Sequence, residues 1–328
     1  MAKPRIFVTR GLVGNGLERL AQSADVSIWP GLDPPPSEAL REHAAKSDAL
    51  LTTIADHLDA TFFDACPSIR VVSQLAVGYD NIDVTAATER SVLVCNTPGV
   101  LTDATADLAF ALMLAHSRRL FAADHALRNG EWGEWSPVFM LSRDLHGKTL
   151  GIVGLGAIGK AVAERAKGFK MPLLYWSRSR KPEAEAELGA QYRELDDLLR
   201  EAHYISIHVA LSDETRGLIG EHEFGLMKPE AVIVNTARGP IIDQDALYEA
   251  LVEKRIGGAA LDVFAEEPLP TDHPLLALEN VVVSPHVGSA TFETRARMTD
   301  LAVDNLLAYF TGEKPPAAVN SEELELTP

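Results

Sequence analysis

Short apolar runs alternate with amphipathic segments along the first part of the chain. The runs are rich in Val, Ile and Leu, which is typical of strands buried on both faces of a sheet. They predict strands at Arg5–Thr9, Val26–Trp29, Ala49–Thr53, Val71–Leu75 and Val92–Asn96, with helices between them at Gly16–Ser23, Ser37–Ser47 and Asp59–Ala65. This βαβ order predicts a parallel sheet with helices on both faces.

The pattern breaks at Asn96-Thr-Pro-Gly99, and a long Ala/Leu/Met-rich helix is predicted from Thr102 to about Phe121. From Thr149 the alternation resumes, with helices between strands, among them Asp243–Glu253 with Asp243 as its N-cap. Six strands are predicted in this half, at Leu150–Gly154, Leu173–Ser177, Tyr204–Val209, Ala231–Asn235, Gly258–Val263 and Val281–Ser284. A last amphipathic helix is predicted at Ala290–Phe310.

These elements predict an α/β fold of two Rossmann-like or flavodoxin-like parallel-sheet domains separated by an interdomain cleft. The last helix is expected to return to the first domain, which makes that domain discontinuous. Residues 1–99 and 288–328 would then bind the substrate, and residues 100–287 would form a dinucleotide-binding Rossmann domain. The two crossings, near Gly99 and Gly288, would form a hinge.

The segment Thr149-Leu-Gly-Ile-Val-Gly-Leu-Gly-Ala-Ile-Gly-Lys160 carries the strongest motif in the chain. An apolar strand runs into Gly154, Gly156 and Gly159, and a helical pattern follows, which is the order that a dinucleotide fingerprint requires. Gly154 would allow the tight turn, Gly156 would let a pyrophosphate approach the backbone, and Gly159 would let helix and strand pack closely. The alternative interpretation is a tight βα turn that binds no ligand.

Composition and charge exclude several classes of function. The formal net charge is -17, which argues against nucleic acid or an anionic membrane as the main partner. The only two cysteines, Cys66 and Cys95, form no CxxC pair, so neither a disulfide framework nor a metal site is expected. The N-terminus begins directly with a strand pattern and no apolar run is long enough to span a bilayer, so we expect a cytoplasmic protein.

The tip of the second strand of the glycine-containing half bears on the choice of nicotinamide cofactor. NAD-binding units place an acidic residue there to bond the ribose 2′-hydroxyl. This chain has Ser177-Arg178-Ser179-Arg180 instead. An arginine can clamp a 2′-phosphate, so the sequence favours NADPH and leaves NADH possible. The alternative is that Arg178 stacks on adenine or lies in solvent.

Three chemically suited side chains follow strands in the same half: Arg238, Glu267 and His286. Because ligands of open α/β sheets bind at the carboxyl ends of strands, the three can converge. Reduction of a 2-keto acid by hydride transfer needs a cation for the carboxylate, which suits Arg238. It also needs a proton donor, which suits His286, and a carboxylate to orient that histidine, which suits Glu267. Each of these three residues, considered alone, could instead have a purely structural role.

The chain resembles the D-2-hydroxyacid dehydrogenase family, and within it the glyoxylate/hydroxypyruvate reductases. The motifs that carry the resemblance span most of the chain. They are Val77-Gly-Tyr-Asp-Asn-Ile-Asp83, Asn96-Thr-Pro-Gly99, the glycine fingerprint, Ala237-Arg-Gly239, Leu261-Asp-Val-Phe264 with Glu267-Pro268, and Ser284-Pro-His286 with Gly288-Ser289. Ala210 departs from the family, in which many members have proline at this position.

The resemblance implies a role for each matching residue. Arg238 would bind the substrate carboxylate together with the backbone amides of Val77 and Gly78, and His286, paired with Glu267 rather than Glu266, would be the acid/base. Asp262 would contact the nicotinamide carboxamide and Thr105 would reach the cofactor. The full set of expected cofactor-binding residues is Thr105, Gly154, Leu155, Gly156, Ala157, Ile158, Ser177, Arg178, Ser179, Thr236, Ala237, Asp262 and Gly288.

The aperiodic segment from Asn129 to His146 has two interpretations. It is either a covered loop or an arm that packs on a partner subunit, because clustered exposed aromatic residues mark interfaces. The resemblance favours a homodimer in which the stretch from Trp135 to Leu141 helps to line the partner's pocket. It implies reduction of glyoxylate or hydroxypyruvate to glycolate or D-glycerate. The alternatives are a D-2-hydroxyacid dehydrogenase for another substrate, namely a bulkier 2-keto acid, phosphoglycerate, formate or phosphite, or a dinucleotide-sensing binding protein.

Overall fold

The computed structural model describes residues 2–324, which fold into two compact units. The first unit contains the chain up to Leu101 and again from Ser289 onward, and the second runs from Thr102 to Gly288. Gly288 belongs with the second unit because its backbone N–H donates to Asp262 at 2.8 Å. The assignment of substrate and dinucleotide to the two domains stays a prediction.

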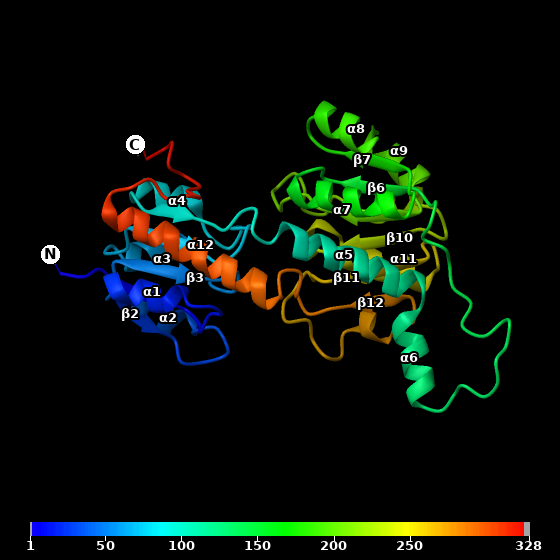
Figure 1. Ribbon diagram of the computed structural model, residues 1–328, viewed down its shortest axis with the longest axis horizontal. Helices are drawn as coiled ribbons and strands as arrows, with labels where there is room; N and C mark the ends of the chain where they lie inside the picture. Colours follow the sequence, from blue (N-terminus) through cyan, green and yellow to red (C-terminus); the bar gives the residue numbers. More distant parts are fainter. Residues whose placement is uncertain (1, 325–328) are drawn as a thin grey trace. The chain divides into compact units, whose positions relative to one another are not determined.

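The first unit is a parallel sheet in the order β2-β1-β3-β4-β5, covered by helices (Figure 1). This is the flavodoxin-like order, in which the strand sequence reverses between β1 and β3. The strands are β1 Arg5–Val8, β2 Asp25–Ile28, β3 Ala49–Thr52, β4 Val71–Gln74 and β5 Leu93–Cys95. The helices are α1 Gly16–Ser23, α2 Ser37–Ala44, α3 Ala60–Ala65, α4 Val84–Glu89 and α12 Phe292–Thr311.

Helix α12 returns from the far end of the chain to complete the first unit. It begins after Thr291, whose side chain accepts a hydrogen bond from the N–H of Thr294, and it ends at Gly312 in the left-handed region with φ +78°. It packs against α1, β3 and β4, and Ser73 of β4 donates to its Ala302 carbonyl at 2.9 Å. The predicted return of the last helix to the first domain is therefore found.

The second unit is a parallel sheet of seven strands in the order β12-β11-β10-β9-β6-β7-β8. Read from the other edge, the order is the Rossmann arrangement with one further strand, β12, and the reversal falls between β6 and β9. The strands are β6 Leu150–Val153, β7 Leu173–Trp176, β8 Gln191–Tyr192, β9 Tyr204–Ile207, β10 Val232–Asn235, β11 Gly258–Leu261 and β12 Val281–Val283. The predicted total of six strands is wrong, because the short polar strand β8 carries no apolar run.

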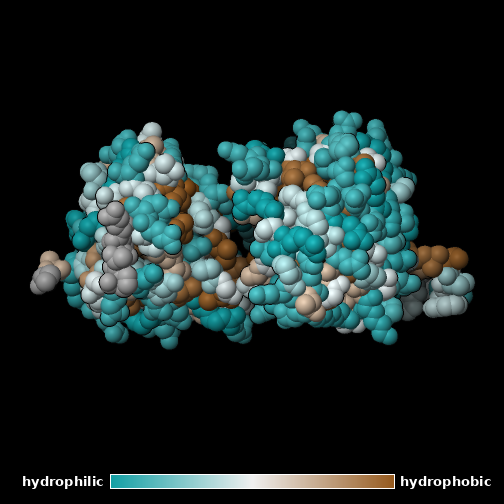
Figure 2. Space-filling view, turned by 90° about the horizontal axis from the view of Figure 1, so that it is seen from above, coloured by the Kyte–Doolittle hydropathy of each residue, from teal (hydrophilic) through white to brown (hydrophobic). Residues whose placement is uncertain are grey.

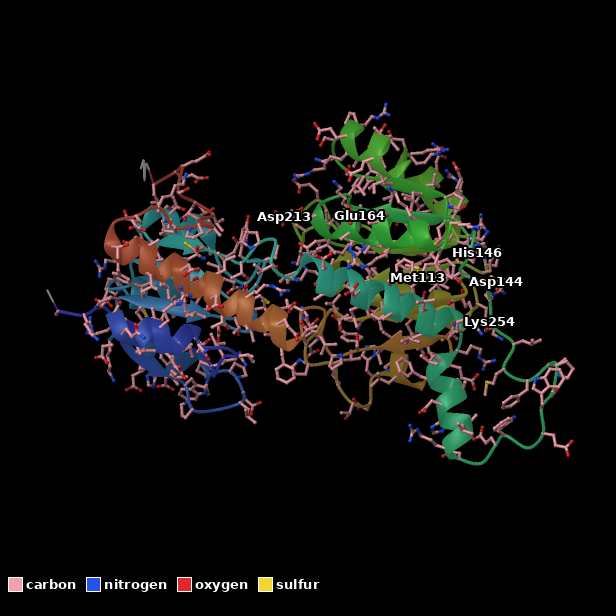
Figure 3. All side chains as sticks on the ribbon, in the orientation of Figure 1. Met113, Asp144, His146, Glu164, Asp213 and Lys254 are labelled. Atoms are coloured by element: carbon pink, nitrogen blue, oxygen red, sulfur yellow. The ribbon has the colours of Figure 1, made fainter. Side chains whose placement is uncertain are left out.

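Helices cover both faces of this sheet (Figure 1). They are α5 Thr102–Ser117, α6 Leu120–Arg128, α7 Ala157–Gly168, α8 Pro182–Leu188, α9 Leu195–Glu201, α10 Glu221–Leu226 and α11 Gln244–Val252, with the 3₁₀ turns η1 Gly239–Ile241 and η2 Pro274–Ala277. The Asp243 side chain caps α11 by accepting from the N–H groups of Asp245 and Ala246, as predicted. The fully buried Met113 lies on α5, which packs against α7 (Figure 3).

The predicted helix from Thr102 to Phe121 is wrong at its end. Helix α5 stops at Ser117, Arg119 adopts the left-handed region with φ +50°, and α6 continues in a new direction. An extended segment then leads from α6 to β6. Its large apolar side chains lie in solvent, and a hydrophobic patch appears where this segment projects from the second unit (Figure 2). The exposed fractions are 55% for Trp132, 80% for Trp135, 71% for Val138, 42% for Phe139 and 65% for Leu141, so the covered-loop interpretation is wrong for the single chain.

Candidate active site

The glycine turn after β6 has the geometry of a phosphate-binding turn. Gly154 has φ +101°, and a Cβ on it would lie 2.7 Å from backbone atoms of both His208 and Val209 in the loop after β9. A Cβ on Gly159 would lie 2.2 Å from the Gly154 carbonyl oxygen, so only glycine allows this close packing of helix on strand. At Gly156 nothing lies within 4 Å of the Cβ position, which leaves open space in front of the N-terminus of α7.

The remaining fingerprint residues lie around that open space. Ala157 and Ile158 form the first turn of α7, where backbone N–H groups have no acceptor within the helix. Leu155 is buried and packs in the core between the sheet and α5. The turn therefore fits a pyrophosphate, because free donors and the positive end of the helix dipole face a space that no side chain fills.

At the tip of β7 the two arginines are in different situations. Arg180 is held by Glu185, with its Nη2 2.6 Å from Oε2, and it lies over the ring of Tyr192. Arg178 is exposed; the pKa of nearby Glu214 is lowered, first by the hydrogen bond from Ser212 and to a smaller extent by the Arg178 charge. The Ser177 hydroxyl donates to the Ser179 carbonyl at 2.7 Å and so fixes the turn. Of the two cations, Arg178 is therefore the one available to a 2′-phosphate.

Asp262, directly after β11, organises the loop that carries His286. Its Oδ1 accepts from the Ser284 hydroxyl at 2.6 Å and from the Val287 N–H at 2.8 Å, while Oδ2 accepts from the Gly288 N–H at 2.8 Å. Burial raises the pKa of Asp262, and these hydrogen bonds oppose that effect. A Cβ on Gly288 would lie 3.3 Å from Asp262 Oδ2 and 3.4 Å from the Thr105 methyl group, so Thr105 of α5 lies beside this loop.

His286 and Glu267 form a pair. His286 Nδ1 lies 2.7 Å from Glu267 Oε2, and Glu267 Oε1 accepts from the Phe264 N–H at 2.9 Å. Burial acts to raise the pKa of Glu267, but the hydrogen bond and charge of His286 outweigh it, so the pKa lies below its ordinary value. Glu267 is therefore ionised at neutral pH, Nδ1 carries the proton that it accepts, and Nε2 is the ring nitrogen left for a substrate.

The backbone of His286 is in the left-handed region, with φ +51°. This conformation costs a residue with a Cβ about 1 kcal/mol or more and persists only where neighbours impose it. Here the His286 N–H donates to the Asp262 carbonyl at 2.8 Å, and the next two N–H groups bind the Asp262 carboxylate. Asp262 thus holds the backbone of His286 in place, and its contact with the nicotinamide stays a prediction.

Arg238 follows β10 in a turn that is built by Asn235. The Asn235 amide accepts from the Ala237 N–H at 3.0 Å and donates to the Arg238 carbonyl at 2.9 Å. The Arg238 charge contributes to the lowered pKa of Glu267, so the two side chains lie close enough to interact. Thr236, at the start of the same turn, has a buried hydroxyl without a hydrogen-bond partner in the described part of the chain.

Gly239 explains why the turn after β10 and the loop after β11 lie together. A Cβ on Gly239 would lie 1.9 Å from the carbonyl carbon and oxygen of Phe264, three residues before Glu267. Only glycine permits this approach of two backbones. The second unit thus brings together Arg238, Glu267, His286 and Asp262 at the carboxyl edge of the sheet that carries the glycine turn, whereas Val77 and Gly78 belong to the first unit.

Three polar residues near this edge had no predicted role: Asn235, Ser284 and His208. Asn235 ends β10 and bonds within its own turn, to Ala237 and Arg238. Ser284 follows β12, and its hydrogen bond to Asp262 depends on tertiary packing. His208 directly follows β9 beside the glycine turn; its Nε2 lies 2.7 Å from the Ser206 hydroxyl, and burial lowers its pKa to about 3. It is therefore neutral and adds no charge beside the phosphate-binding turn.

No helix among the described residues is long and apolar enough to cross a membrane. Residues 2–324 also contain no group of three or more His, Cys, Asp or Glu side chains arranged to hold a metal ion.

Comparison with known proteins defines the class. The model of the NAD binding domain of D-isomer specific 2-hydroxyacid dehydrogenases matches residues 110–288. The chain belongs to this family, and its cofactor is a nicotinamide dinucleotide. Within the family it is similar to glyoxylate reductases: it is 52% identical to that of Aeropyrum pernix over 99% of this chain and 98% of the relative.

Solved structures agree with this placement. A glyoxylate reductase from Paecilomyes thermophila superimposes with a TM-score of 0.88 at 33% identity, covering 98% of this chain and 100% of that one. An NADPH-dependent glyoxylate/hydroxypyruvate reductase from Sinorhizobium meliloti, in complex with NADP and malonate, superimposes with a TM-score of 0.85 at 32% identity, covering 97% of each chain. Both neighbours match nearly the whole chain, so the similarity includes both units.

Proposed function

We propose that this protein reduces glyoxylate, and also hydroxypyruvate, to the 2-hydroxy acid with a reduced nicotinamide dinucleotide. The observation that carries the proposal is the His286–Glu267 pair beside Arg238, at the carboxyl edge of the sheet that bears the glycine turn. The similarity to glyoxylate reductases supports the choice of substrate.

The chain's own side chains supply the polar part of the chemistry. Arg238 offers a planar fork to the substrate carboxylate, and the backbone amides of Val77 and Gly78 are further donors in this proposal. When bound, the reduced nicotinamide supplies the hydride to the carbonyl carbon. His286 gives the proton on Nε2 to the developing alkoxide oxygen, and Glu267 stabilises the imidazolium form before that transfer. Asp262 keeps the histidine loop in position.

The simplest test is a substrate panel followed by the absorbance of the nicotinamide. We expect turnover of glyoxylate and hydroxypyruvate, and we expect His286→Ala to lower kcat about 10²–10⁴-fold, the usual contribution of a general acid. Turnover confined to bulkier 2-keto acids would move the proposal to another substrate. If no substrate of the panel is turned over although the protein binds the dinucleotide, the protein would instead be a dinucleotide-sensing binding protein.

The proposal includes a preference for NADPH, supported by Arg178 at the tip of β7 and by the absence of a carboxylate there. Arg178→Ala should raise the KM for NADPH about 10-fold or more and leave the KM for NADH nearly unchanged, because only the 2′-phosphate is lost as a partner. Arg180→Ala is the matched control, since Glu185 already holds that guanidinium. Equal KM changes for both cofactors would contradict this assignment.

We also propose that the enzyme is a homodimer in which the segment from Asn129 to His146 is an arm that packs on the partner. The support is the set of large apolar side chains that it exposes, with Trp135 80% exposed. Trp135→Ser combined with Leu141→Ser should weaken the dimer, as measured by sedimentation over a concentration series. A wild-type protein that stays monomeric at every concentration would refute the proposal that this segment packs on a partner subunit.

A further inference from the structure

A turn that follows β4 in the first unit has its carbonyl groups occupied and its N–H groups unoccupied. Asn96 Nδ2 donates to the Val77 carbonyl at 2.8 Å, and Gln74 Nε2 donates to the Gly78 carbonyl at 3.3 Å. The N–H groups of Val77 and Gly78 have no hydrogen-bond acceptor in the described part of the chain. Both residues are partly exposed. Adjacent free backbone donors of this kind form a concavity for an anion.

The amide of Gln74 is itself fixed in one orientation. Gln74 is fully buried at the end of β4, where its Oε1 accepts from the Thr52 hydroxyl at 2.9 Å. This leaves its NH₂ group directed to the Gly78 carbonyl and to Asn81 Oδ1, which lies 2.6 Å away. Because the oxygen and the nitrogen have different partners, the amide cannot flip without losing these hydrogen bonds.

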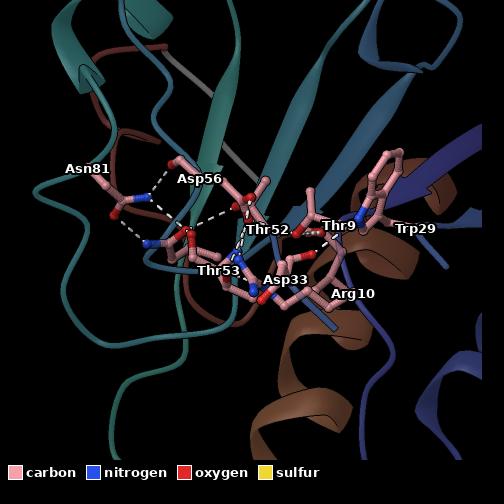
Figure 4. Close-up of polar contacts among 10 residues, drawn as sticks. Thr9, Arg10, Trp29, Asp33, Thr52, Thr53, Asp56 and Asn81 are labelled. Atoms are coloured by element: carbon pink, nitrogen blue, oxygen red, sulfur yellow. Dashed lines mark hydrogen bonds and ion pairs between the residues drawn. The ribbon is translucent and has the colours of Figure 1, made fainter. Parts of the chain in front are cut away.

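Asn81 joins this turn to the loop after β3 (Figure 4). Its Nδ2 donates to the Asp56 carbonyl at 2.7 Å and to the Thr53 carbonyl at 3.2 Å. The Asp56 side chain is buried, and its Oδ2 accepts from the Thr9 hydroxyl and the Thr53 N–H, each at 2.7 Å. The loops after β1, β3 and β4 are therefore tied into one rigid network at the carboxyl edge of the sheet, where ligands of such folds bind.

We propose that Asn96, Gln74 and Asn81 are positioning residues that preset the Val77–Gly78 turn as the binding site for the substrate's carboxylate. The inference rests on the proposed reduction of a 2-keto acid and adds the residues that build this part of the site. Donors that are already oriented bind a carboxylate without the cost of ordering the turn. Removing an amide that holds one of the carbonyls releases the turn while leaving its own N–H donors in place.

Asn96→Ala tests this in the full-length enzyme. We expect the KM for glyoxylate to rise about 10-fold, the range for one lost charge-assisted contact, with the KM for the dinucleotide unchanged. For glycolaldehyde, which has the aldehyde but no carboxylate, kcat/KM should stay as in the wild type. The affinity for oxalate, measured by calorimetry, should fall by a similar factor. Asn96→Gln keeps an amide and should recover part of both losses.

Asn320→Ala is the matched control. Asn320 is also a buried asparagine of the first unit, and it makes three hydrogen bonds, to the Val94 N–H, the Thr88 hydroxyl and the Val92 carbonyl. It lies outside the network around the turn, so the control should lower the melting temperature without changing the ratio of the two kcat/KM values. Asn81→Ser, on the partly exposed side of the network, provides a second variant if Asn96→Ala folds poorly.

The outcomes separate this inference from the proposed function. An active wild type whose Asn96→Ala and Asn81→Ser variants keep the same KM for glyoxylate would overturn the inference alone. Equal losses on glyoxylate and glycolaldehyde would also overturn it, because they would assign Asn96 to folding. A wild type that neither reduces glyoxylate nor binds oxalate would overturn the inference together with the proposed function. A selective loss for the carboxylate-bearing substrate supports it.

Discussion

Replacing Glu267 with glutamine probes the pair on which the proposed chemistry depends. The wild-type carboxylate accepts two hydrogen bonds, from His286 Nδ1 at 2.7 Å and from the Phe264 N–H at 2.9 Å. A glutamine has nearly the same shape but only one acceptor atom. If its oxygen keeps the Phe264 N–H, its NH₂ group faces Nδ1 and opposes the doubly protonated imidazolium. The variant should therefore fold and bind cofactor while losing the carboxylate partner of His286 Nδ1.

The size of the loss follows from the contact and its exposure. A hydrogen bond to a charged group contributes about 1.5–3 kcal/mol. The side chains of His286 and Glu267 are 27% and 33% exposed, so solvent screening favours the lower half of that range, about 1.5–2 kcal/mol. At about 1.4 kcal/mol per factor of ten, kcat/KM for glyoxylate reduction should fall about 10- to 30-fold.

The assay is the pH dependence of kcat/KM for glyoxylate at saturating reduced cofactor. Glu266→Gln is the control, because it removes a neighbouring exposed carboxylate that does not bond His286. We expect the control to follow the wild-type curve. A Glu267→Gln variant that keeps the wild-type kcat/KM across the pH range would refute the assignment of the pair to proton transfer.

Three other predictions concern the same loops and the buried thiols. Gly239→Ala should lower the free energy of unfolding by about 3 kcal/mol, because its Cβ would lie 1.9 Å from the Phe264 carbonyl. Gly168→Ala, whose Cβ would have nothing within 4 Å, should leave stability unchanged. Thermal melts of the two variants test this. Because the pKa of Glu267 is lowered in the folded protein, its carboxylate stabilises the fold fully at pH values above its unfolded pKa of about 4.3. That stabilisation is lost as the pH falls through the lower pKa of the folded state. The melting temperature of the wild type should therefore exceed that of Glu267→Gln by less in acid than at neutral pH. Cys66 and Cys95 are buried, and burial raises the pKa of the Cys95 thiol to about 12, so a thiol reagent should label neither until the protein unfolds; rapid labelling of the native protein would contradict this.

Much of the fold could be predicted from the sequence because buried parallel strands are continuous apolar runs. The runs around Val71 and Ile152 are unambiguous for this reason. Strand β8 could not be found this way, since an edge strand needs pairing on only one side and Gln191–Tyr192 is polar. The end of α5 was missed because no glycine or proline marks it; Arg119 takes the left-handed conformation that glycine usually adopts at such a position.

The site was predictable where its residues follow strands, and less so where tertiary contacts decide. The positions of Arg238, Glu267 and His286 at strand ends put them at one edge of one sheet. No local pattern shows that Glu185 engages Arg180 and leaves Arg178 exposed, or that Asp262 receives three hydrogen bonds from a loop more than twenty residues away. Such contacts depend on how loops of different strands pack.

The interrupted first unit has a consequence for synthesis on the ribosome. The second unit is one continuous stretch from Thr102 to Gly288, so it can fold as soon as it has emerged. The first unit cannot be completed at that stage, because α12, which covers β3 and β4 and packs on α1, is translated last. Until then the nascent chain exposes the apolar sheet face that α12 later covers, and such a surface is prone to aggregation.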